Sequence, residues 1–206
     1  MYNFDPNDLT KEKSIFDIFK KTIKIRVSKF HKLIIISIFI ISSLGSYFLK
    51  ITPDQIRHLS EIGFNFGMTT LGFLIAGFTI FTTLAKPEMM LSMMNHQNEK
   101  YKIPTLKYNL FVFMKVFIHF IFFTFLYLSV IAFGQSGGLV SKLIFIITPY
   151  ISKNIILCIL YTIIVCSLFH LLLSLKTFIF NTYAIVMSTL RWEYHISSTT
   201  KKTDEK

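Results

Sequence analysis

The chain has 206 residues, of which 52% are hydrophobic and only 16% are charged, and its formal net charge is +11. Soluble proteins carry roughly a quarter charged residues, and a domain of this size leaves much of its surface exposed. The apolar residues therefore exceed what a soluble core can bury. The composition excludes a disordered chain and a disulfide scaffold, and it predicts a membrane protein.

Four apolar stretches are long enough, or nearly so, to cross a bilayer as helices, which takes about 18 to 20 residues. None of them alternates like a strand, so helices are predicted rather than a barrel. A fifth run, Leu143–Tyr150, is too short to span, and we expect a re-entrant or interfacial segment there. The predicted spans are residues 33–49, 62–85, 116–133 and 155–175.

The distribution of positive charge predicts the orientation. Residues 1–32, 86–115 and 176–206 hold 18 of the 22 Lys and Arg residues, and the other two connections hold 4. Positive residues are retained in the cytoplasm. We therefore expect an all-α, N-in/C-in membrane protein. It would have a basic cytoplasmic segment (1–32), a four-helix transmembrane domain (33–175) and a cytoplasmic helix with a polar tail (176–206).

Residues 14–31 form a predicted amphipathic helix, because Ser14 and Asp17 match a capping box and apolar residues recur at helical spacing. Such a basic helix typically lies on an anionic leaflet as an interfacial helix. The alternative is that cytoplasmic basic residues bind a polyanion such as a nucleotide or oligonucleotide. The candidate contacts for that ligand are Lys20, Lys21, Lys24, Arg26, Lys29, Lys100, Lys102, Lys107 and Arg191.

A methionine-rich segment lies between Pro87 and Pro104. Its four thioethers and His96 are ligands that Cu(I) accepts. Methionines spaced four apart on a short helix are more often packing residues. Packing is therefore predicted, and no cofactor or metal site is expected.

The last span is predicted to continue as a helix beyond the membrane. Residues 177–194 contain no Gly or Pro, and apart from one polar stripe they are largely apolar. A soluble helix with so much apolar surface must pack against something, which predicts a homo-oligomer. The polar tail from Ser197 to Lys206 is expected to be loose.

The second span carries a stripe of small and polar residues that recur every three or four positions. Small residues let helices pack closely, and their hydroxyls bond across an interface. The other interpretation is that several copies of this face line a water-filled pore. Gly63 and Gly67 form a separate GxxxG pair beside the stripe. The pore-lining candidates are Asn65, Thr69, Gly72, Ala76, Thr79 and Thr83.

Groups that would carry chemistry are scarce. The predicted spans contain no Asp or Glu, and their ionisable side chains are His119 and His170, with Lys115 one turn before His119. A proton-coupled carrier generally needs a carboxylate relay, and each histidine is more often a packed, hydrogen-bonded residue. No hydrolase, zinc-protease, nucleotide-binding or redox motif is present. We therefore expect no enzyme.

Two stretches resemble a known class of proteins. They are Gly72–Glu88 (GFLIAGFTIFTTLAKPE) and Leu175–Trp192 (LKTFIFNTYAIVMSTLRW). Both look like features of small bacterial four-pass membrane effectors of antiphage defence operons, such as the channel component of Hailong systems. The resemblance covers about 35 residues. It implies an oligomeric channel in the bacterial inner membrane, controlled by a nucleotide-derived signal from an operon-encoded partner enzyme.

The sequence thus leaves two functions open. The first is a homo-oligomeric ion channel or membrane-depolarising effector that is gated from the cytoplasm. The second is a non-conducting membrane anchor or assembly subunit that recruits a cytoplasmic partner. The two differ in whether the second-span stripe lines a pore or packs.

Overall fold

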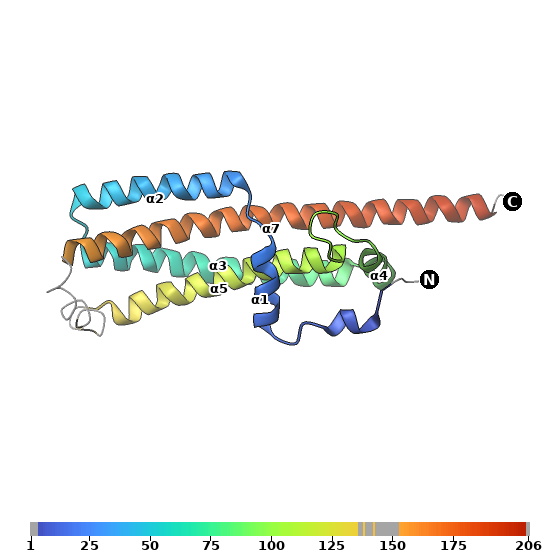
Figure 1. Ribbon diagram of the computed structural model, residues 1–206, viewed down its shortest axis with the longest axis horizontal. Coiled ribbons are helices and arrows are strands. Elements are labelled where there is room, and N and C mark those ends of the chain that lie inside the picture. The colour runs from blue at the N-terminus through green and yellow to red at the C-terminus, as the bar shows by residue number, and fades with distance from the viewer. Residues whose placement is uncertain (1–3, 136–137, 139–141, 143–152, 205–206) are drawn as a thin grey trace. The chain divides into compact units, whose positions relative to one another are not determined.

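The computed structural model describes residues 4–135, 138, 142 and 153–204, and the regular elements among them are helices (Figure 1). Helices α2, α3, α5 and α7 are each long and apolar enough to cross a membrane, which confirms the predicted all-α, four-span fold. The expected re-entrant run Leu143–Tyr150 lies outside the described residues. The elements are η1 (Pro6–Thr10), α1 (Ile15–Lys24), α2 (Lys29–Leu49), α3 (Pro53–Leu84), α4 (Pro87–Asn95), α5 (Thr105–Phe133) and α7 (Lys153–Asp204).

Two of the long helices begin well before the predicted spans. α3 begins at Pro53 and α5 at Thr105, whereas hydropathy places the spans from residues 62 and 116. Hydropathy marks only the part of a helix that suits lipid, and the polar first turns belong to the same helices. At the start of α3, Thr52 and Gln55 exchange side-chain to backbone hydrogen bonds of 3.0 and 3.4 Å, as in a capping box.

α7 continues without interruption to Asp204. Its 52 residues correspond to about 78 Å at 1.5 Å per residue, more than twice the roughly 30 Å hydrocarbon layer. The predicted helical continuation past residue 175 is confirmed. The expectation of a loose tail from Ser197 is wrong as far as Asp204, because no Gly or Pro follows residue 152 to end the helix.

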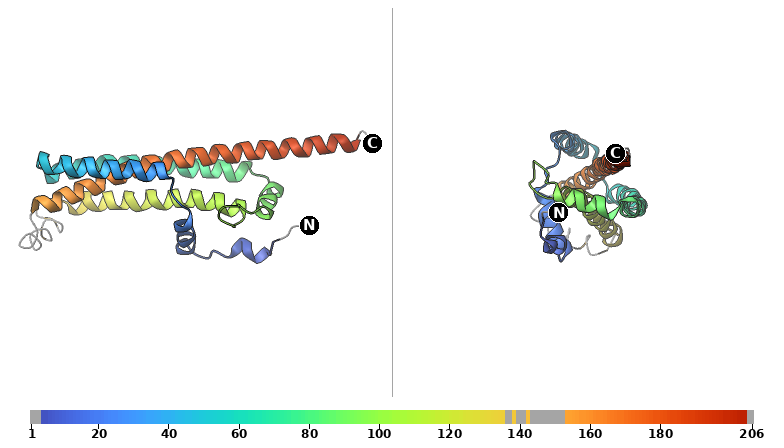
Figure 2. Two further views of the ribbon diagram at one scale, coloured as in Figure 1. Left: turned by 45° about the horizontal axis from the view of Figure 1, so that its top comes forward. Right: turned by 90° about the vertical axis from the view of Figure 1, so that its right-hand side faces the viewer.

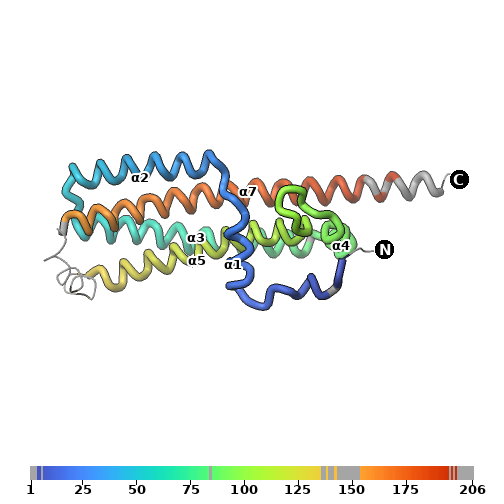
Figure 3. The backbone as a smooth tube through the Cα atoms, in the orientation of Figure 1, coloured from blue at the N-terminus to red at the C-terminus, as the bar shows by residue number. Residues whose placement is uncertain are grey.

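The predicted single helix over residues 14–31 is interrupted between Lys24 and Lys29 (Figure 3). The capping box of Ser14 and Asp17 is confirmed, but Ile25 has extended backbone angles. Ile25 is buried against α5, and the ammonium of Lys115 donates a 2.7 Å hydrogen bond to the Ile25 carbonyl. That bond takes the place of the backbone hydrogen bond that the Ile25 carbonyl would accept if the helix continued. Ser28 then caps α2.

The chain packs as two units, and α3, α5 and α7 each contribute to both. The first unit comprises residues 1–26, 74–117 and 175–206. Its centre is Phe113, which is completely buried and has its ring centroid 5.1 to 5.9 Å from those of Phe78, Phe81 and Phe178. In this unit α1 runs across the axis of α5 rather than along it (Figures 1 and 2).

The second unit comprises residues 27–73 and 118–174. Its α5 and α7 segments bury large side chains such as Phe120, Tyr127 and Leu171. α2 differs, because its buried residues are His31, Ser42 and Ser46, while most of its Leu, Ile and Phe side chains are exposed. Small and polar contacts with an apolar outer face are typical of a helix surrounded by lipid.

Candidate functional site

The six stripe residues of α3 are all exposed on the chain. A Cβ atom added at Gly72 would meet no atom within 4 Å. The stripe is therefore not buried by the described chain, and its surface is accessible to lipid, water or another copy.

The face of α3 that packs within the chain is the one with the GxxxG pair. A Cβ atom at Gly63 would lie 2.8 Å from a ring carbon of Tyr127, and one at Gly67 would collide with the hydroxyl of Thr124. The two glycines thus let α3 approach α5 closely inside the second unit. Close packing within the chain and the small-residue stripe use different sides of the same helix.

Two stripe threonines present their oxygens in a defined way. Thr79 Oγ1 donates to the carbonyl of Ile75 at 3.0 Å, and Thr83 Oγ1 donates to the carbonyls of Thr79 and Ile80, each at 3.0 Å. Because each hydroxyl hydrogen is directed back to the helix, the oxygen keeps its lone pairs as acceptors. Such oxygens can replace part of the hydration of a cation.

Several of the predicted polyanion contacts lie on two segments that pack together in the first unit. Ile18 and Ile25 pack in one hydrophobic cluster with Tyr101 and Ile103 of the 96–104 loop and with the start of α5. This cluster attaches residues 15–26 to the loop, while the basic residues on both segments are exposed. The cationic residues gathered on these two segments are Lys20, Lys21, Lys24, Arg26, Lys100 and Lys102.

Three other predicted contacts are placed differently. Lys107 forms a 2.7 Å ion pair with Glu12, and their side chains are only 12% and 13% exposed, so this charge is already neutralised. Lys29 belongs to α2 in the second unit, and Arg191 is exposed on α7.

The amphipathic helix α1 divides its apolar surface between two environments. Ile18, Thr22 and Ile25 face the chain, with Thr22 and Ile25 buried. Phe16, on the neighbouring flank of the helix, is 74% exposed. Ile15 and Ile23 on the same flank are each more than half exposed. An exposed aromatic and aliphatic flank beside lysines is typical of a helix at a lipid surface.

The methionine segment forms the short helix α4. Met89 and Met94 are each 2% exposed, so these thioethers serve as packing residues. His96 lies at the end of α4, exposed, and its carbonyl accepts hydrogen bonds from the backbone and the hydroxyl of Thr105.

Three imidazoles form a chain that the sequence did not predict. His31 Nε2 lies 3.0 Å from His170 Nδ1, and His170 Nε2 lies 3.1 Å from His119 Nδ1. The three residues come from α2, α7 and α5 of the second unit. The sequence places His119 and His170 inside predicted spans, where ionisable residues stand out. His31 was missed because it precedes its span, and no spacing rule relates it to a residue 139 positions away.

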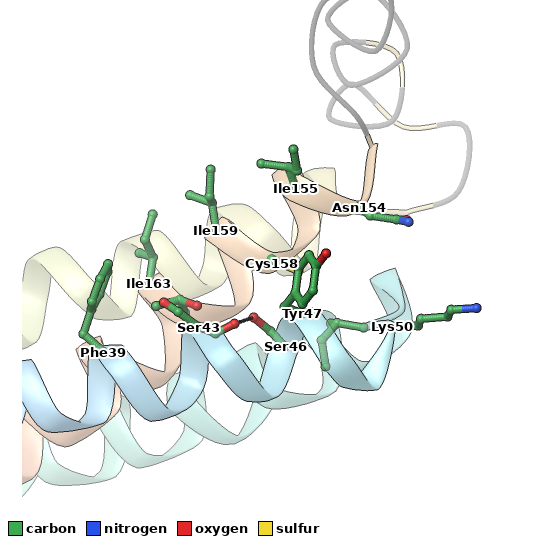
Figure 4. A pocket seen from close by; sticks show the side chains of 12 residues that line it. Phe39, Ser43, Ser46, Tyr47, Lys50, Asn154, Ile155, Cys158, Ile159 and Ile163 are labelled. Carbon is green, nitrogen blue, oxygen red and sulfur yellow. Dashed lines mark hydrogen bonds between the residues drawn. The ribbon is translucent and has the colours of Figure 1, made fainter.

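A cavity of about 640 Å³ lies between α2 and α7 in the second unit (Figure 4). Phe39, Tyr47, Ile155 and Ile159 give it apolar walls, and Lys50 stands at one end. None of the predicted pore or polyanion residues lines this cavity.

Comparisons of the chain with protein-family models, with curated proteins and with solved structures find no match.

Proposed function

We propose that this protein is a homo-oligomeric ion channel, or membrane-depolarising effector, that is gated from the cytoplasm. The observation that carries the proposal is the stripe of α3, which includes an amide and three hydroxyls and whose six residues are all exposed on the described chain. Several copies arranged around an axis would enclose these groups in a water-filled path.

Exposure of the stripe to lipid is unfavourable. The amide of Asn65 has no water to bond in hydrocarbon, and burying such a group without a hydrogen bond costs on the order of 2 kcal/mol or more. Facing copies of the chain remove that cost by surrounding the stripe with water or with one another. The outward lone pairs of Thr79 and Thr83 then suit an ion-conducting path.

Further assembly surface is available on α7. Phe180, Tyr183, Leu190 and Tyr194 are each more than half exposed along the helix beyond residue 175. Apolar patches of this kind mark interaction sites. We assign them to contacts between copies, which would place the first units side by side on the cytoplasmic face.

The gating ligand in this proposal is a nucleotide-derived anion, as the resemblance to antiphage effectors implies. Its candidate contacts are the basic residues that α1 and the 96–104 loop bring together. Binding of an oligonucleotide to detergent-solubilised protein should weaken steeply with salt, because phosphate contacts release counterions. Replacing Lys20, Lys21 and Lys24 by Gln should flatten that dependence. Salt-independent binding, or none at low salt, would contradict this assignment.

The direct test is reconstitution of the purified protein in planar bilayers. Thr79→Leu should abolish conductance and leave the oligomer intact. Thr82→Leu is the matched control, because Thr82 is also exposed and bonds its own helix but lies off the stripe. Silence of folded wild-type protein under all ligands and voltages would overturn the proposal.

The second candidate is a non-conducting anchor that recruits a cytoplasmic partner. The compact first unit favours it, because α1, α4 and the 96–104 loop there offer a surface independent of any pore. In that case the stripe packs between copies, and Thr79→Leu lowers the stability of the oligomer. Mass measurement of both threonine variants in nanodiscs distinguishes the two functions.

A further inference from the structure

We propose that His31, His170 and His119 form a proton-binding chain, which holds one proton among three rings and passes it between α2 and α5. The inference is independent of ion conduction by the α3 stripe. It rests on the two ring-to-ring distances of 3.0 and 3.1 Å and on which nitrogens face each other.

The pairing of nitrogens fixes the tautomers of the neutral rings. A neutral imidazole has one donor nitrogen and one acceptor nitrogen. If His31 Nε2 donates, His170 Nδ1 accepts, so His170 must donate from Nε2 to His119 Nδ1. All three rings are then protonated on Nε2. In the opposite direction all three are protonated on Nδ1, and any mixture breaks a hydrogen bond.

One added proton fits at every ring without loss of either hydrogen bond. On His170, both nitrogens donate outward, and on His31 or His119 the cation donates along the chain. A second proton does not fit, because the outer rings would both donate to a neutral His170 that has a single acceptor. The chain therefore takes up one proton rather than three.

Transfer along the chain needs no movement of the rings. A proton binds His31 Nδ1, and the Nε2 proton of His31 moves to His170 Nδ1. The Nε2 proton of His170 then moves to His119 Nδ1, and the Nε2 proton of His119 leaves. One proton has entered and one has left, and all three rings have changed from the Nε2 to the Nδ1 tautomer. Passage in the opposite direction restores them.

The surroundings favour transfer over storage of charge. Neither α2 nor α5 contains a carboxylate, and Phe123 packs on His170 with the ring centroids 5.6 Å apart. An imidazolium at His170 is thus stabilised by hydrogen bonds to both neighbouring rings. The other titratable or charged side chains close in sequence on the three helices are Lys29, Lys32, Lys115, Cys166 and Lys176. Those of α3 up to Phe73 are Asp54, Arg57, His58 and Glu61, all in its first three turns.

The position of the three histidines fits proton exchange with the cytoplasm. Each of the three histidines lies within five residues of the predicted cytoplasmic end of its span. Histidine is the side chain whose unperturbed charge change falls between about pH 5 and 8.

Nitrogen-15 NMR of histidine-labelled wild-type protein in phosphatidylcholine–phosphatidylglycerol liposomes, with EDTA present, is the test. At about pH 8 we expect one common tautomer for the three rings, each assigned by its His→Gln variant. On acidification to about pH 5 their signals should move together and report one proton. Mixed tautomers, three independent titrations, or no titration would each overturn the proposal.

Potentiometric titration independently counts the protons that the three histidines take up. Wild-type protein should take up one proton more than the triple variant His31→Gln, His119→Gln, His170→Gln over the same range. His96→Gln is the control, because His96 is exposed and outside the chain of rings, and it should leave the tautomers unchanged. If the triple variant does not fold, the wild-type spectra decide alone.

Discussion

Replacement of Gly63 by alanine should destabilise the second unit. The added methyl would lie 2.8 to 3.0 Å from three ring carbons of Tyr127, where ordinary contacts begin at 3.4 Å. The ring cannot swing aside, because Tyr127 is fully buried and its hydroxyl bonds Ser167 at 2.7 Å. Ser167 directs its own hydrogen to the Ile164 carbonyl, so the tyrosine is the donor.

The magnitude follows from two opposing effects. Overpacking a rigid contact costs about 1 to 3 kcal/mol, and replacing glycine by alanine inside a helix returns up to about 1 kcal/mol. We expect a net loss of about 1 to 2 kcal/mol for Gly63→Ala. Gly72→Ala is the matched control, because its methyl meets nothing within 4 Å, and it should be neutral or stabilising.

Reversible unfolding in mixed detergent micelles measures both variants. The same substitution in a Tyr127→Ala background should lose its penalty, because the ring that obstructs the methyl is absent. Equal stability of the Gly63 and Gly72 variants, or an unchanged penalty without the ring, would refute the close approach of α3 and α5.

Three further predictions concern ionic contacts of the first unit. Lys107→Met alone should destabilise by about 3 kcal/mol, since it leaves the poorly exposed Glu12 unpaired, and Lys107→Met with Glu12→Leu should recover most of the loss in the same unfolding assay. Glu193, 2.6 Å from the ammonium of Lys86, raises the pKa of that group. Because the folded pKa of this lysine is raised, the ion pair contributes its full stabilisation below the unfolded pKa of about 10.4. That stabilisation is lost as the pH rises through the folded pKa. The Tm difference between wild type and Lys86→Met should therefore be flat from about pH 6 to 9 and shrink above about pH 10.5. Lys115→Met should release the chain between α1 and α2, measured as faster proteolysis there.

Hydropathy and periodicity predicted the features that one segment determines by itself. The four long helices, the capping box of Ser14 and the α3 stripe all follow from local composition and spacing. The break between α1 and α2 could not be predicted in this way. Its cause is the hydrogen bond between Lys115 and the Ile25 carbonyl, which joins residues 90 positions apart.

The candidate sites were predictable to different degrees. Spacing identified the stripe residues. Their common exposure depends on which face of α3 packs against α5, and that face is the one with Gly63 and Gly67. Charge identified the basic residues of α1, yet it could not reveal that Glu12 neutralises Lys107. The three histidines come from separate helices, so their proximity is a property of the packed helices alone.

The attachment of α2 has a consequence for biosynthesis. His31 of α2 contacts His170 of α7, which is synthesised 139 residues later. At about 5 to 20 residues per second, the ribosome needs about 7 to 28 s to cover that distance. During this interval α2 is in the lipid before α7 has been made. Because lipid is as apolar as the surface of α2, no hydrophobic force drives α2 to pack against another helix. In chains that stop before α7, the imidazole of His31 would lack the His170 ring that lies 3.0 Å from it in the complete fold.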